Sequence, residues 1–129
     1  MTVLAAVLTV GCRSTPKPEA PKLAVGWRPA GAWSGQGNTQ TESFEIQSGQ
    51  FRIQWQTTNE TAPGAGTFRV TVHSGVSGRP LMLAVDHRGP GSGTAVVTDD
   101  PRPYYLEIES SRLDWSISVQ EGVVGAVTH

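Results

Sequence analysis

The imidazoles are the first side chains of this sequence to consider for chemistry. There are three, His73, His87 and His129, and none pairs with another histidine at the spacing of metal ligands. His73 falls on the polar side of an alternating segment, and His87 follows Asp86 at the end of another. An imidazole needs a second functional group beside it for acid–base catalysis or metal binding. We therefore expect exposed surface histidines, with a dyad or a three-ligand metal site assembled in three dimensions as the alternative.

The other reactive side chains lack the spacing found in known catalytic and metal sites. No serine stands in a GxSxG nucleophile elbow. Asp99 and Asp100 precede Pro101, but without the ligand spacing of a dedicated calcium loop, which favours a solvated turn. The sequence therefore predicts no enzyme activity, no cofactor and no metal site. A small hydrolase that uses His73 or His87 is the least favoured alternative.

Cys12 is the only cysteine of the chain, so there is neither an internal disulfide nor a cysteine-built zinc site. It follows an uncharged, apolar run, residues 1–11 (MTVLAAVLTVG), which is too short to span a membrane but has the length of a signal-peptide core. Residues 8–12 (LTVGC) resemble the lipobox of bacterial lipoproteins, with the small Gly11 directly before the cysteine. Thr9 stands where that family usually has an aliphatic residue.

The lipobox resemblance implies that Cys12 is the lipid attachment site. In that family the thiol receives a diacylglycerol, the preceding peptide is removed and the new amino terminus is usually acylated. Each buried methylene contributes about 0.8 kcal/mol, so two or more chains anchor a protein stably. We expect residues 1–11 to be a signal peptide and the protein to lie in the cell envelope, facing the extracytoplasmic side. An inert thiol behind an apolar leader is the alternative.

Residues 12–26 have the composition of a disordered tether. The stretch 13–22 (RSTPKPEAPK) contains three prolines and no apolar side chain larger than alanine. Such a segment buries too little surface to offset its ordering entropy, and its prolines favour extended polyproline II. The tether carries a net charge of +2, and the chain from Trp27 onward a net charge of −3. Because phosphate contacts need clustered cations, nucleic acid is not an expected partner.

Short segments that alternate between apolar and polar residues fill the chain after residue 30. In one of them Phe51, Ile53 and Trp55 are separated by Arg52 and Gln54. A period of two, with turn residues between the segments, indicates half-buried antiparallel strands. The expected strands are residues 31–36, 41–47, 51–57, 66–73, 80–86, 93–98, 103–109 and 113–120.

About eight short strands predict an all-β domain over residues 27–122, followed by a tail at 123–129. An antiparallel two-sheet β-sandwich of the jelly-roll kind is the favoured architecture. Residues 103–120 (PYYLEIESSRLDWSISVQ) are similar to the final hairpin of pre-peptidase C-terminal domains. That resemblance implies an accessory, non-catalytic module.

Three aromatic side chains are candidates for ligand binding. Most aromatic residues, Trp55 among them, fall on the apolar registers and are expected in the core. Trp27 and Trp33 precede or open the first strand, and Tyr105 alternates outward. A flat patch of these three could stack on sugar rings, because aromatic faces give large contact areas. Tryptophans that close the ends of the sandwich are the alternative.

Taken together, these features predict a membrane-anchored lipoprotein that binds or scaffolds through an extracytoplasmic β-sandwich. A cell-wall glycan or an envelope protein is the expected partner besides the membrane. A carbohydrate- or peptidoglycan-binding module is the alternative function. This alternative predicts that at least two of Trp27, Trp33 and Tyr105 are exposed and coplanar.

Overall fold

The computed structural model describes residues 22–127, with side chains from Gly26 to Val124. These residues form nine β-strands and no helix, so they contain no helix that could cross a membrane. The strands are β1 (Lys22–Gln36), β2 (Thr39–Gln40), β3 (Phe44–Ile46), β4 (Gln50–Thr58), β5 (Thr67–Ser74), β6 (Pro80–Arg88), β7 (Gly91–Thr98), β8 (Arg102–Ser111) and β9 (Asp114–Val127). The predicted signal peptide and Cys12 lie outside the described residues.

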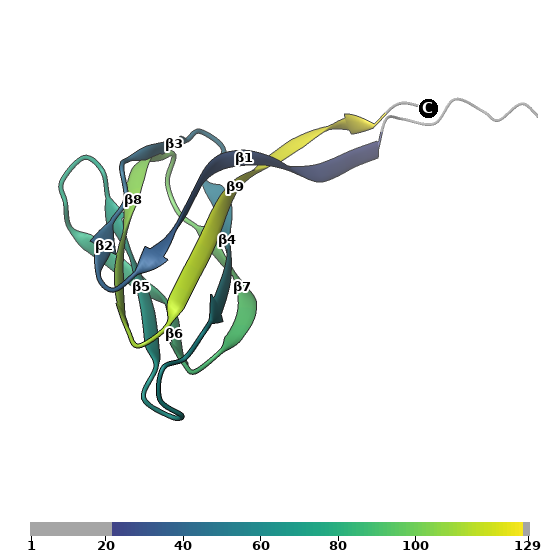
Figure 1. Ribbon diagram of the computed structural model, residues 1–129. Helices are drawn as coiled ribbons and strands as arrows, with labels where there is room; N and C mark the ends of the chain where they lie inside the picture. The colour runs from purple at the N-terminus through teal and green to yellow at the C-terminus, as the bar shows by residue number, and fades with distance from the viewer. Residues whose placement is uncertain (1–21, 128–129) are drawn as a thin grey trace, which may run out of the picture.

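The strands form two antiparallel sheets that pack face to face (Figure 1). Sheet A has the order β1-β9-β4-β7, and sheet B has the order β2-β8-β5-β6. β3 also pairs with β8, so β2 and β3 share one strand position. The predicted strand 41–47 is shortened to β3, and β2 lies just before it. The pairing is nested, with the first strand beside the last, which is the arrangement of a jelly roll. The predicted all-β, two-sheet sandwich is therefore confirmed.

The core lies between the two sheets and is built from the alternating apolar residues. Phe51 and Ile53 of β4 are fully buried, whereas Arg52 between them reaches solvent. Each such apolar side chain contributes about 1.5–3 kcal/mol when it leaves water. Phe44, Phe51 and Tyr104 pack together across the sheets, with ring centroids 5.0 Å apart for Phe51 and Tyr104. This core fixes which side of each strand faces solvent.

A two-stranded ribbon projects beyond the sandwich where both ends of the described chain meet (Figure 1). Residues 22–28 of β1 pair with residues 121–127 of β9, and we call this ribbon the arm. β1 therefore begins inside the range predicted as tether (12–26), and β9 continues into the range predicted as tail (123–129). Apolar and polar residues do not alternate regularly in residues 22–28 or 121–127, so the sequence does not indicate that these segments pair as strands.

A buried carboxylate joins the base of the arm to the sandwich. Glu121 is only 3% exposed, and it accepts a hydrogen bond from Arg28 Nη2 at 2.6 Å. Its other oxygen accepts the backbone N–H groups of Gln47 and Ser48, each at 2.7 Å. Burial alone would raise the pKa of Glu121, but these hydrogen bonds and the charge of Arg28 hold the pKa below its ordinary value. The charged carboxylate thus fixes the turn between β3 and β4 against the arm.

Candidate functional site

Sheet A presents an uncharged surface to solvent in the middle of its four strands. Two neighbouring rows of side chains cross the sheet there, as the strand register shows. We call them the neutral face: Ser34, Ser116, Gln56 and Ser92 in one row, and Ala32, Ser118, Gln54 and Thr94 in the next. The residues between the rows, such as Ile117, turn toward the core. The neutral face therefore points away from the core.

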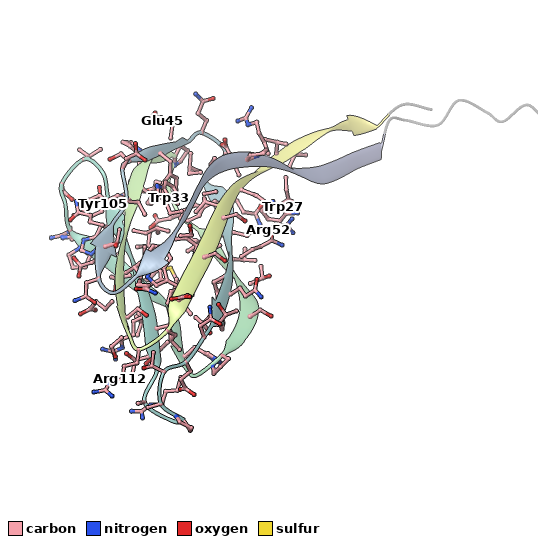
Figure 2. The ribbon with its side chains drawn as sticks, in the orientation of Figure 1. Trp27, Trp33, Glu45, Arg52, Tyr105 and Arg112 are labelled. Carbon is pink, nitrogen blue, oxygen red and sulfur yellow. The ribbon has the colours of Figure 1, made fainter. Side chains whose placement is uncertain are left out.

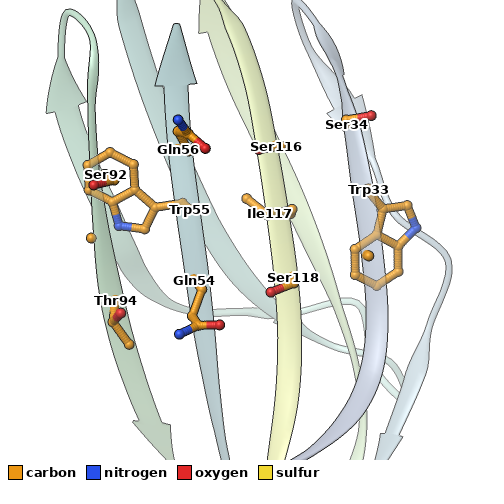
Figure 3. A pocket seen from close by; sticks show the side chains of 12 residues that line it. Trp33, Ser34, Gln54, Trp55, Gln56, Ser92, Thr94, Ser116, Ile117 and Ser118 are labelled. Atoms are coloured by element: carbon orange, nitrogen blue, oxygen red, sulfur yellow. The ribbon is translucent and has the colours of Figure 1, made fainter.

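A shallow, open hollow lies over the neutral face, and Figure 3 shows the residues that line it. The hollow has a volume of about 700 Å³ and runs across all four strands of sheet A. Besides the eight residues of the neutral face, its lining includes Trp33, Trp55, Gly93 and Ile117 from the row between them. Six of the eight side chains on the neutral face are serine, alanine or threonine, which extend little above the sheet and leave this space open beside Gln54 and Gln56.

Seven of the eight side chains on the neutral face carry a hydroxyl or an amide group. Both groups donate as well as accept hydrogen bonds. On this side of sheet A, side-chain hydrogen bonds lie beyond the two ends of the neutral face, from Arg52 to Gln120 and from Gln36 to Asp114. The hollow thus offers a dense set of uncharged donors and acceptors to a ligand that is itself rich in hydroxyl groups.

The tryptophans at the hollow are anchored on the core side of the sheet. Trp33 packs on Phe44 with ring centroids 5.8 Å apart and donates from Nε1 to Glu42 at 3.2 Å. Trp55 packs on Phe68 at 5.6 Å but is only partly buried, so its predicted place in the core is partly wrong. It lies beside Gly93, where an added Cβ would come within 2.8 Å of the indole.

Trp27 belongs to the arm and lies on the outer surface of sheet A, beyond the neutral face (Figure 2). Its ring lies beside Gly122, where an added Cβ would be 3.3 Å from the indole. The guanidinium of Arg52 lies over the ring, 4.3 Å from the centroid. Arg52 Nε also donates to Gln120 Oε1 at 2.5 Å. One face of Trp27 is therefore occupied by a cation and is not an open stacking surface.

Tyr105 lies on the other sheet, so the predicted platform of three aromatic residues is not formed. Its ring stacks on that of His73, with centroids 4.8 Å apart and an angle of 15° between the planes. Figure 2 shows Tyr105, Trp33 and Trp27 well apart. The expectation of a coplanar patch was wrong because Tyr105 belongs to β8 in sheet B, whereas both tryptophans belong to β1 in sheet A.

The histidines are less exposed than the sequence predicts. His73 lies on the outer side of β5, as expected, but it is 8% exposed because Tyr105 covers its ring. Its Nδ1 lies 3.1 Å from the carbonyl oxygen of Gly78, which accepts, and its Nε2 lies 3.8 Å from a carboxylate oxygen of Glu107. His87 is half-buried and packs on Trp55, with ring centroids 4.8 Å apart. His129 lies outside the described residues.

Asp99 and Asp100 lie in an exposed turn before β8, beside the positively charged side chain of Arg102. Arg102 Nη2 is 3.4 Å from Asp99 and 3.0 Å from Asp100. The backbone carbonyl of Asp100 also accepts from the hydroxyl of Tyr104. The guanidinium thus pairs with both carboxylates, and the turn is a local ion-pair network.

The neutral face could not be found from the sequence, although its polar residues are visible there. Ser116 and Ser118 alternate with apolar residues in one segment, and Gln54 and Gln56 do so in another. The two segments become neighbours only through the pairing of β4 with β9. In the sequence, the one indication of this surface is that Ser116, Ser118, Gln54 and Gln56 are uncharged at outward positions.

Comparisons with known proteins add little to this description. No family model matches the chain, and no curated protein matches its sequence. Among solved structures, the fold is similar to a chain described as "Structure of infectious bursal disease virus Gt strain", with a TM-score of 0.43 and 13% sequence identity. The match covers 89% of this chain, which spans 36% of the length of that one.

Proposed function

We propose that this protein is a non-catalytic binding module, anchored to a membrane through a lipid on Cys12, that holds an envelope polysaccharide on the neutral face of sheet A. The observation that carries the binding function is the uncharged hollow of about 700 Å³ lined by hydroxyl and amide groups. Polysaccharides present many hydroxyl groups that both donate and accept. Such groups pair with serine, threonine and glutamine side chains without dehydrating a charge.

The anchoring part of the proposal rests on the chain before β1. The lipobox-like residues 8–12 place Cys12 directly before a proline-rich stretch, and β1 begins at Lys22. A lipid on Cys12 would hold the sandwich near the membrane by the arm. The neutral face lies on the body of the sandwich, beyond the base of the arm.

A blocked hollow tests the binding function. In the full chain, Ser116→Tyr places a phenol ring in the hollow. We expect the affinity for envelope polysaccharide to fall at least tenfold, which corresponds to about 1.4 kcal/mol of binding free energy. Binding is measured by sedimentation with isolated cell-wall sacculi and by calorimetry with soluble neutral glucans. The matched control is Ser111→Tyr on the exposed outer side of sheet B, which should bind like the unmodified chain. Equal binding by the two variants, or no binding to any polysaccharide, would contradict the proposal.

The anchor is tested separately by the mass of the mature amino terminus in a membrane fraction. An acylated Cys12 as the first residue is expected, together with release or incomplete processing of a Cys12→Ser variant. An unmodified Cys12 in a soluble fraction would leave a binding module without the proposed anchor.

A further inference from the structure

Arg52 introduces a positive charge on the outer surface of sheet A, next to the neutral face. Its neighbours across the strands are Gln120 on β9 and Val96 on β7. Along β4, Gln54 of the neutral face is two residues away, about 7 Å. A ligand that lies on the neutral face and extends toward the arm therefore meets the guanidinium of Arg52.

The guanidinium is held in a fixed orientation by two uncharged partners. The ring of Trp27 lies 4.3 Å from its central carbon, and Gln120 accepts from its Nε at 2.5 Å. Trp27 contacts a face of the guanidinium and Gln120 uses Nε, so neither contact takes up the N–H groups on the Nη1 and Nη2 edge. This edge carries the parallel N–H groups that pair with both oxygens of a carboxylate.

Among the described residues, no acidic side chain forms an ion pair with Arg52. The nearest acid along β9 is Glu121, whose carboxylate turns to the opposite side of the strand and pairs with Arg28. Asp114 lies on the same surface, but its partner Thr58 is six residues from Arg52 along β4, about 20 Å away. The charge of Arg52 is thus not balanced within this surface.

We propose that Arg52, held by Trp27 and Gln120, binds a carboxylate carried by the polysaccharide on the neutral face, so that the ligand is a uronic-acid polymer. This inference rests on the proposed function and names its ligand class. One guanidinium matches one negative charge per binding site. The sugar hydroxyls of the same or the next residue then reach Gln54 and Ser118, which lie in the adjoining row.

The test compares acidic polymers with their own neutral derivatives. The full chain is titrated with polygalacturonate, alginate and hyaluronan, and with each polymer after chemical reduction of its carboxyl groups. At low salt we expect at least one acidic polymer to bind about tenfold more tightly than its reduced form, which is the size typical of a charge-assisted bidentate contact. Arg52→Gln should remove this preference, so that the acidic polymer and its reduced form bind with equal affinity.

A second variant changes the charge without removing Arg52. Gln120→Glu places a carboxylate against the guanidinium, so it should also abolish the preference while preserving the fold. The control is Arg69→Gln on sheet B, where Arg69 already pairs with Asp86 and should not affect binding. Equal binding of acidic and reduced polymers, or a preference that persists in Arg52→Gln, would overturn the inference and leave the proposed function intact. Failure of all polysaccharides to bind, including the sacculi and neutral glucans that test the proposed function, would overturn both.

Discussion

The outer surfaces of the two sheets carry different kinds of polar side chains. Sheet A presents the neutral face, with hydroxyls and amides in the middle and Arg52 on one side. The outer surface of sheet B is charged, and Arg69 lies there between Asp86 on β6 and Glu109 on β8. Both surfaces are polar enough for water. They differ in the free energy needed to dehydrate them.

Covering a charged surface with a ligand requires each charge to find a new partner, because an unpaired charge is costly to dehydrate. A surface of hydroxyls and amides exchanges its water for ligand hydroxyls at a much smaller cost. The comparison therefore favours sheet A as the binding side and sheet B as the side that stays in water. It also shows that sheet A places its acids at its margins, Glu121 buried near the arm and Asp114 at the other end.

The largest effect is expected from removing the buried acid of sheet A. Glu121→Ala leaves the guanidinium of Arg28 and the N–H groups of Gln47 and Ser48 without their acceptor. We expect the free energy of unfolding to fall by about 2 kcal/mol, because two backbone N–H groups lose a charged acceptor, whereas the Arg28 side chain is 58% exposed and stays hydrated. The measurement is urea unfolding followed by tryptophan fluorescence. The control is Glu109→Ala on the exposed surface of sheet B, expected to change stability by less than about 0.5 kcal/mol. Similar losses in the two variants would remove the contrast between the sheets.

The same carboxylate should make stability depend on acid pH. Since the pKa of Glu121 in the folded protein is held below its ordinary value of 4.5, its contribution is fully present above about pH 4.5. The contribution is lost as the pH falls through the folded-state pKa. Urea unfolding between pH 3 and pH 7 should therefore show a steeper decline for the unmodified chain than for Glu121→Gln. Parallel curves would mean that Glu121 ionises alike in the folded and unfolded states.

The smallest effect is expected on the charged surface of sheet B. The ion pair between Arg69 and Asp86 spans 3.5 Å, and both side chains are about half exposed. Water and salt screen such a pair, so Asp86→Asn should change the free energy of unfolding by about 0.5 kcal/mol or less. A double-mutant cycle with Arg69→Gln measures the coupling directly. A coupling above about 1 kcal/mol would show that charge stabilises both sheets to a similar degree.

The strands and the buried registers followed from local sequence. Phe51 and Ile53 alternate with Arg52 and Gln54, and the structure buries the first two and leaves the others partly in solvent. The reason is geometric, because successive side chains of a strand point to opposite faces. Turn residues separate the strands. Gly49, between β3 and β4, has a φ of 79°, a conformation that glycine adopts more readily than other residues.

The exposure of individual side chains, and the side chains of other strands that lie beside them, did not follow from local sequence. His73 alternates outward as predicted, yet the stacked ring of Tyr105, 32 positions later, covers it. Trp55 falls on the buried register, yet it lies beside a glycine near the edge of sheet A and stays partly exposed. In both cases the outcome depends on a residue of another strand, which the alternation of a single strand does not specify.

The all-β class, the position of most strands and the side of each strand that faces the core follow from local sequence, because they depend on a period of two along the chain. Three features arise only in the folded chain: β4 and β9 lie together, four strands bring uncharged residues to one hollow, and Arg52 lies over Trp27 beside it. These features arise from pairing between segments far apart in the chain. Such pairing is fixed by the packing of the whole core and is invisible in any one segment.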